Sequence, residues 1–209
     1  LWFFGINGPD VMNSVYFIGN VLTADQLLAF EAGTPNNELP HIFTNPFSNF
    51  FTNFGGGGST LSLVICMLLF CKSERIKVLG RLSIVPGIFG INEPIIFGLP
   101  IVLNPIMIIP FIFVPLFNLV TSYLLTIAEI LPKTTGVNLP WTTPIGFSGW
   151  LSTGSWIAAV WQIILLVIGC CIYFPFIKAL DKGYLHDEEN SEDTEEEDIS
   201  FDDLSLDDL

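Results

Sequence analysis

One glutamate inside an apolar stretch is the residue of this sequence best suited to chemistry. Glu93 lies in Gly90-Ile91-Asn92-Glu93-Pro94, within the apolar residues 82–103. An ionisable side chain inside a membrane segment is energetically expensive and normally faces a cavity, a partner or a substrate. Its carboxylate and the amide of Asn92 offer the acceptors and donors that a polyhydroxyl ligand needs. We therefore predict that Glu93 and Asn92 bind a ligand. The alternative is a structural glutamate that caps a helix end or lies at the membrane interface.

Two other motifs carry weaker signals. Trp141, in Pro140-Trp141-Thr142-Thr143-Pro144, could stack on a sugar face or anchor the chain at a membrane interface. Asn7, in Gly5-Ile6-Asn7-Gly8, could contact a ligand or belong to a simple turn. The four glycines at 55–58 suggest a phosphate cradle, but the lysine and the serine or threonine of a P-loop are missing. Close packing through small residues is the favoured interpretation of this glycine run.

The composition separates an apolar body from an acidic tail. The 209 residues are 51% hydrophobic, 13% charged and have a mean hydropathy of +0.61. Thirteen of the 21 acidic residues lie between Asp187 and Asp208, so residues 1–186 hold eight acids against all seven bases. Because a soluble domain carries roughly a quarter charged residues, this body is typical of a membrane protein. The composition argues against nucleic-acid binding, a disulfide scaffold and an ordinary soluble enzyme.

The cysteines and histidines do not form a metal-binding pattern. The four cysteines lie in or beside apolar runs without a CxxC spacing, which favours buried free thiols: Cys66, Cys71, Cys170 and Cys171. The two histidines, His41 and His186, are not near a cysteine cluster. We expect no metal site and no cofactor.

Two segments are long and apolar enough to cross a membrane, residues 105–130 and 155–177, since a span needs about 20 apolar residues. In the second, Gln162 is the one strongly polar residue. Residues 59–71 are shorter and are expected to form a helix that continues into the charged residues 72–81. Residues 20–54, which are polar and contain three prolines, are expected to be an extramembrane or interfacial connection.

The basic residues predict how the chain crosses the membrane. Lys72, Arg75, Lys77 and Arg81 form one cluster, and Lys178 and Lys182 form another. Short basic loops favour the cytoplasmic side, so both clusters should lie there, and an even number of crossings must separate them. Residues 82–103, with three prolines and three glycines, should then enter and return as a re-entrant hairpin or a pair of broken segments. The loop 131–154, with Lys133, should lie on the opposite side and fold partly back.

The predicted fold is an all-α integral membrane protein with transmembrane helices and re-entrant hairpins. Residues 1–182 form the membrane domain. Residues 183–209 are expected to be a disordered, acidic, cytoplasmic tail, because such a density of like charge opposes folding.

The longest of these motifs resembles a known family. The run from Pro86 to Pro100, followed by Asn104-Pro105, is similar to the signature of the membrane (IIC) component of the bacterial sugar phosphotransferase system, in the lactose, cellobiose and diacetylchitobiose branch. The resemblance extends over about residues 1–185 and includes four further motifs: residues 2–8, the glycine run, residues 140–144 and residues 173–181. It matches the C-terminal half of the family's permease, so we expect an N-terminal half to be missing from this chain.

The resemblance implies a permease of the bacterial cell membrane that is a homodimer at full length. It implies that Glu93, as the catalytic-site acid, hydrogen-bonds the hydroxyl to be phosphorylated on a β-linked disaccharide, with Asn92 and Trp141 near the ligand. A separate cytoplasmic IIB subunit, supplied by IIA, would donate the phosphoryl group. Where the family usually has Gly-Ile-His-Gly, Asn7 replaces the histidine and removes a titratable imidazole. Two alternatives remain: a proton-coupled secondary transporter with Glu93 as the proton carrier, and a truncated permease without function.

Overall fold

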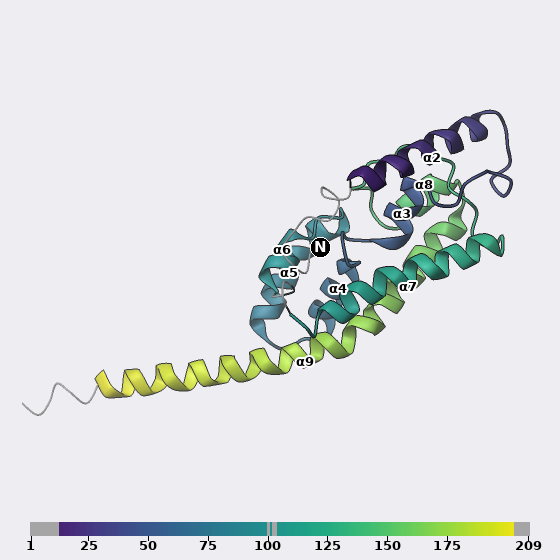
Figure 1. Ribbon diagram of the computed structural model, residues 1–209. Helices are drawn as coiled ribbons and strands as arrows, with labels where there is room; N and C mark the ends of the chain where they lie inside the picture. The colour runs from purple at the N-terminus through teal and green to yellow at the C-terminus, as the bar shows by residue number, and fades with distance from the viewer. Residues whose placement is uncertain (1–12, 100, 102–103, 203–209) are drawn as a thin grey trace, which may run out of the picture.

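The computed structural model describes residues 13–99, 101 and 104–202 (Figure 1). In that part of the chain the regular secondary structure is entirely helical, which confirms the predicted all-α class. The helices are α2 (Asn13–Glu31), α3 (Asn45–Thr52), α4 (Thr60–Phe70), α5 (Glu74–Ile88), α6 (Glu93–Gly98), α7 (Ile108–Ile127), α8 (Phe147–Thr153) and α9 (Trp156–Asp202).

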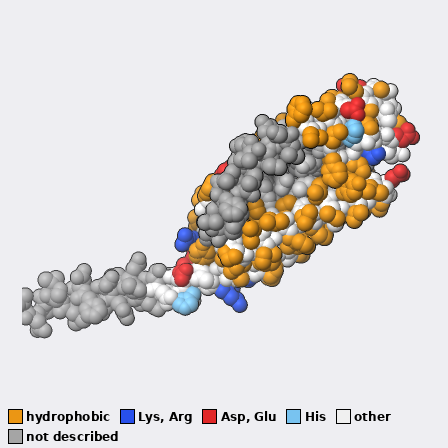
Figure 2. Space-filling model, in the orientation of Figure 1, with side chains coloured by type: hydrophobic (Ala, Val, Ile, Leu, Met, Phe, Trp, Pro, Cys, Tyr) orange, Lys and Arg blue, Asp and Glu red, His pale blue; other side chains and the backbone are white. Residues whose placement is uncertain are grey.

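The two predicted membrane spans are confirmed as long apolar helices. Helix α7 and the stretch Trp156–Glu188 of α9 are long and apolar enough to cross a membrane, and the two helices lie side by side (Figure 1). Their outer faces carry exposed large apolar side chains, and hydrophobic groups cover much of the visible body (Figure 2). Hydrocarbon is the surrounding in which such a surface is stable.

Residues 82–103 enter and return, as the prolines and glycines predict. Helix α5 runs in and α6 runs back beside it, with residues 89–92 at the tip. The two arms pack closely because Gly98 has no side chain: a Cβ there would lie 2.5 Å from Leu79 Cδ1. At the tip the N–H of Ile91 bonds to the carbonyl of Pro86 over 3.0 Å, which ends α5. This pair is therefore a re-entrant hairpin.

The region of α3 differs from the prediction that residues 20–54 are a polar connection. Helices α3 and α4 are joined by a turn at residues 53–59, although α3 packs mainly on α7 and α4 mainly on α9. This helix–turn–helix unit is called the first hairpin below, and the α5–α6 pair is called the second hairpin. In α3 the aromatic side chains of Phe47, Phe50 and Phe51 are buried, whereas its asparagines made the segment look like a loop. The helix starts at Thr44, whose Oγ1 accepts from the N–H of Phe47 over 3.3 Å. Pro46 stands in its first turn, where proline is well tolerated. A threonine cap followed by this proline is the sequence signal that could have located α3.

Helix α4 does not continue into the basic residues, and this expectation was wrong. It ends at Phe70, and α5 begins at Glu74. The carboxylate of Asp181, on α9, accepts from the N–H groups of Lys72 (2.9 Å) and Ser73 (3.0 Å). Ser73 then caps α5 by accepting from the N–H of Ile76 over 3.4 Å. The break is stable because a buried carboxylate satisfies backbone donors that a continuous helix would use internally.

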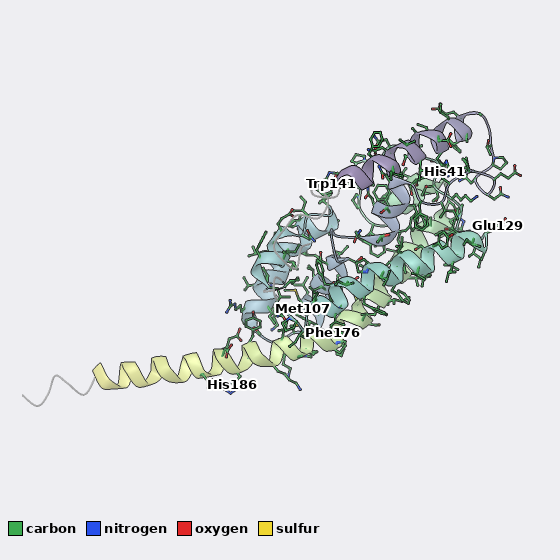
Figure 3. All side chains as sticks on the ribbon, viewed as in Figure 1. His41, Met107, Glu129, Trp141, Phe176 and His186 are labelled. Carbon is green, nitrogen blue, oxygen red and sulfur yellow. The ribbon has the colours of Figure 1, made fainter. Side chains whose placement is uncertain are left out.

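Apart from Glu93, the charged groups of the described body gather toward its two ends (Figure 2). At one end Lys178 Nζ donates to the carbonyl of Phe70 over 2.7 Å, so the two basic clusters lie together there, as the predicted location on one side of a membrane requires. At the other end lie Glu129 and His41, well separated from His186 (Figure 3). Glu93 is at the hairpin tip, 15 residues along α5 from the basic end, or roughly 22 Å at 1.5 Å per residue.

The loop after α7 folds back onto the protein, as expected. Thr134 is buried, and its Oγ1 lies 2.6 Å from Thr44 Oγ1. Thr135 bonds through its N–H to the carbonyl of Ser152 over 2.8 Å. The cysteines are free, as predicted, but their burial differs: Cys66 and Cys71 are buried, Cys170 is half-buried and Cys171 is exposed.

The acidic tail differs from the prediction of disorder over its first part. Helix α9 continues through the acidic residues to Asp202, and residues 203–209 lie outside the described part. The carboxylate of Glu188 accepts from Ser73 Oγ (2.6 Å) and from the N–H of Arg75 (3.1 Å). Arg75 also lies over the ring of Tyr184, 4.9 Å from its centroid. These contacts hold the start of the tail against α5, and glutamate is itself a good helix former.

Candidate functional site

The tips of the two hairpins meet through Asn92. Its Nδ2 donates to the carbonyl of Gly57 over 2.8 Å, and its side chain is buried. The backbone at Gly56 has φ +92°, and a Cβ there would lie 2.5 Å from Asn92 Cγ. Glycine is therefore needed at position 56 for both its conformation and its size. This junction lies one residue before Glu93.

The glycine run forms a tightly held turn at the tip of the first hairpin. Its other three carbonyls accept from Thr60 Oγ1 (Gly55, 2.6 Å), from the N–H of Ser59 (Gly56, 3.1 Å) and from Tyr173 OH (Gly58, 2.6 Å). A Cβ at Gly58 would lie 2.4 Å from the ring of Phe111. The glycines thus serve close packing, as predicted, although at a turn and not along a helix face.

Glu93 is the first residue of α6, and its side chain is exposed. Among the described residues, none hydrogen-bonds to its carboxylate or forms an ion pair with it. Asn92, at the N-cap, directs its amide to Gly57 and makes no capping bond. Within the described part of the chain, the Glu93 carboxylate therefore does not have the capping role of the structural alternative.

Trp141 lies beside the tip of the second hairpin. A Cβ at Gly90, where φ is +84°, would lie 3.4 Å from Trp141 Cε3, so the indole packs against a bare backbone. The turn that carries Trp141 is closed by Thr143, whose N–H bonds to the carbonyl of Pro140 over 2.9 Å. The side chain remains 61% exposed, and it lies between the two ends of the body (Figure 3). This location favours ligand stacking over an anchor at a membrane interface.

A small cavity of about 20 Å³ joins these parts. Its lining combines polar and aromatic groups, among them Asn49, Phe50, Asn53, Gly90, Trp141 and Ser148. That volume holds about one water molecule, so a sugar would need the walls to separate. A larger cavity of about 430 Å³ lies at the end of the body that carries Glu129, and Glu129 and Lys133 line it. None of the predicted site residues that the structure describes lines this larger cavity. Trp141 lines the smaller one, and Asn92 and Glu93 follow its lining residue Gly90 in the chain without lining it themselves. The smaller cavity is therefore the candidate site.

The structure brings three of the four predicted site residues into one region, since Asn92 and Glu93 are consecutive and Trp141 packs on Gly90. Asn7 lies outside the described residues. Sequence reasoning missed the amides of Asn49 and Asn53, because it read α3 as a connection. It noted Gln162 as the one polar residue of a span but gave it no role. A buried polar residue in an apolar helix was the signal that could have found it.

Comparison with known proteins identifies the family of this chain. Residues 1–115 match the model of the family described as "Phosphotransferase system, EIIC". The chain is 44% identical over 191 residues to the oligo-beta-mannoside-specific EIIC component of Bacillus subtilis, covering 90% of this chain and 42% of that protein. It is 42% identical over 193 residues to the cellobiose-specific EIIC component of Geobacillus stearothermophilus, with coverage of 90% and 42%.

A solved structure shows the same fold. The crystal structure of ChbC, the IIC component of the N,N'-diacetylchitobiose-specific phosphotransferase system, superposes with a TM-score of 0.86 at 39% identity, covering 90% of this chain and 43% of that one. The chain thus spans less than half the length of these relatives. With the family model matching more than half of its residues and the hairpin fold shared, the chain belongs to the EIIC family of membrane components of the phosphotransferase system.

Proposed function

We propose that this chain is the sugar-binding part of a phosphoenolpyruvate-dependent permease that carries a β-linked disaccharide of the cellobiose, chitobiose or lactose type. Residues 1–182 form the C-terminal part of the permease domain. The contact between Asn92 and Gly57 is the observation that carries this proposal. It holds the tips of two hairpins together, and so sets Glu93 and Trp141 at one place within an otherwise apolar body.

The side chains beside the Asn92–Gly57 contact bind different parts of the sugar. The Glu93 carboxylate accepts a hydrogen bond from the hydroxyl that becomes phosphorylated, and Trp141 stacks on a sugar face. Asn92 uses Nδ2 within the protein, so its Oδ1 is the atom left to accept from a hydroxyl. Asn7 contributes a further amide. It cannot carry out any step that needs a titratable group at that position.

The phosphoryl donor belongs to another subunit. A cytoplasmic IIB protein, phosphorylated on cysteine and recharged by IIA, transfers its phosphoryl group to the bound sugar, and this chain supplies no donor and uses no cofactor. The permease crosses the bacterial cell membrane several times, acts as a homodimer at full length and keeps its C-terminus in the cytoplasm. The meeting of Lys178 with the α4 end supports that orientation, because it gathers both basic clusters at one end.

Uptake by membrane vesicles tests this function. Vesicles carrying the gene product that contains this chain are given radiolabelled cellobiose, diacetylchitobiose or lactose, with IIB, IIA and the general phosphotransferase proteins inside. We expect uptake to require phosphoenolpyruvate and the internal sugar to be phosphorylated. Accumulation of unmodified sugar driven by a pH gradient alone would instead support a proton-coupled transporter with Glu93 as the carrier. If neither occurs, the chain is a permease fragment without function.

A further inference from the structure

The amide of Gln162 is fully buried in the apolar part of α9 and bonds to two other segments, α3 and the start of α8. Its Oε1 accepts from the backbone N–H groups of Gly146, over 2.7 Å, and Gly149, over 3.0 Å. Its Nε2 donates to the carbonyl of Phe50 over 2.6 Å and to Ser148 Oγ over 2.9 Å. Both ends of the amide are thus satisfied, which explains how a polar side chain is tolerated there.

These partners belong to the two walls of the small cavity. Phe50, on α3, and Ser148, on α8, both line it, and Gln162 bonds to both. Gly146 directly follows the segment of Trp141, Thr143 and Ile145, which lines the same cavity. A single side chain from the neighbouring span therefore fixes the separation between the α3 wall and the wall that carries Trp141.

The close fit extends to the glycine opposite the amide. A Cβ at Gly149 would lie 2.7 Å from Gln162 Oε1 and 2.8 Å from the carbonyl of Ala158. Glycine at position 149 is therefore needed for the amide to reach its place. Position 149 offers a second way to displace Gln162 without changing Gln162 itself.

We infer that Gln162 is a positioning residue for the sugar site. It makes no contact with the sugar and acts by holding α3 and the Trp141 segment at the separation that the sugar requires. This inference rests on the proposed function, since it concerns the affinity of that same site. A residue that only stabilised the fold would change the amount of folded protein and leave the affinity of the folded molecules unchanged.

The neighbouring residue provides a matched control. Trp161 lies next to Gln162 on α9, and its Nε1 donates to Ser122 Oγ of α7 over 2.9 Å. This bond joins two spans and does not touch the cavity. Trp161→Phe removes one hydrogen bond between helices and keeps the bonds of Gln162 to both walls. Gln162→Met keeps an unbranched side chain of similar size and removes those bonds. An apolar residue at position 162 also favours membrane insertion.

The test measures equilibrium binding of radiolabelled disaccharide to membranes that contain the wild type, Gln162→Met or Trp161→Phe, together with phosphoenolpyruvate-dependent uptake at saturating sugar. We expect Gln162→Met to raise Kd at least tenfold, with saturated uptake per folded molecule within about twofold of the wild type, and Trp161→Phe to leave Kd within twofold. An unchanged Kd in Gln162→Met overturns the inference. If Gln162→Met does not accumulate, Gly149→Ala is measured in the same way, and an unchanged Kd in that variant overturns it equally. If the wild type itself binds none of the disaccharides, the proposed function fails and the inference fails with it.

Discussion

The amide of Asn92 donates to the carbonyl of Gly57 over 2.8 Å and so joins hairpin tips that are 35 residues apart in the chain. Irregular backbone at membrane depth is tolerated only where it is buried in protein or lines a watery cavity. Here Asn92 in one tip donates a hydrogen bond to a backbone carbonyl of the other tip. The next residue in the chain is Glu93, whose carboxylate is exposed. The contact therefore stabilises irregular backbone that hydrocarbon would not tolerate, and it places an acidic residue beside that backbone.

Glu93→Gln should abolish or severely weaken uptake while membrane insertion stays intact. The substitution keeps the size of the side chain but removes the charged acceptor, and a hydrogen bond to a charged group is worth about 1.5–3 kcal/mol, or roughly 10- to 150-fold in affinity for the reacting hydroxyl. Transport assays with immunodetection in the membrane fraction check this. Glu129→Gln, in an exposed acid at the far end of the body, is the control and should transport normally. Full activity of Glu93→Gln would return Glu93 to a structural role.

Gly56→Ala should separate the hairpin tips and weaken sugar binding at least tenfold. The added Cβ would lie 2.5 Å from Asn92 Cγ, so the amide must leave the carbonyl of Gly57. Loss of that bond leaves the buried amide of Asn92 without its acceptor, at a cost of about 1–3 kcal/mol. Equilibrium binding of a labelled disaccharide gives the affinity.

Gly33→Ala is the matched control for backbone strain. Gly33 has φ +90°, close to the +92° of Gly56, but its Cβ would meet nothing within 4 Å. Both variants therefore carry a strain of about 1 kcal/mol from the left-handed conformation, and only Gly56→Ala also displaces Asn92. Equal loss of binding in the two variants would show that strain, and not the junction, sets the affinity.

Asp181→Ala should lower the free energy of unfolding by about 3 kcal/mol, because it removes the acceptor of two backbone N–H groups, and an unsatisfied buried group costs about 1–3 kcal/mol. The Asp181 carboxylate is buried and accepts from Lys178 Nζ over 3.1 Å as well as from two backbone N–H groups. Thermal unfolding of the purified protein in detergent measures the effect. Glu74→Ala breaks only the exposed ion pair with Lys77, and should change stability by roughly 0.3 kcal/mol. Similar losses in the two variants would contradict the role of Asp181 in holding α5.

Local patterns in the sequence predicted the spans and the second hairpin. The even number of crossings between the two basic clusters required residues 82–103 to return, and the prolines and glycines of that segment indicated the same. The first hairpin was missed because α3 alternates asparagine with phenylalanine, so its composition looks polar while its aromatic face is buried.

Of the candidate site, the sequence predicted the functional residues but not the contacts that hold them in place. Glu93 could be predicted because an acidic side chain in an apolar membrane segment is energetically costly and is usually functional. The partners of Asn92 and Gln162 could not be predicted, since Gly57 lies 35 residues from Asn92 and Phe50 lies 112 residues from Gln162. No local propensity specifies contacts at such separations; they depend on the packing of the whole bundle.

The tail gives a final prediction, in which two truncations differ in their effect. Deleting residues 191–209 should leave both uptake and thermal stability unchanged, because the contacts of α9 with α5 that the structure describes come before that point. Deleting residues 187–209 should leave uptake nearly unchanged but lower the melting temperature, since it removes the bonds of Glu188 to Ser73 Oγ and to the N–H of Arg75. Glu188→Ala in the full chain isolates this contribution and should reproduce most of the loss in stability. Loss of uptake on deleting residues 191–209 would contradict this prediction, and would show that the distal acidic residues take part in transport.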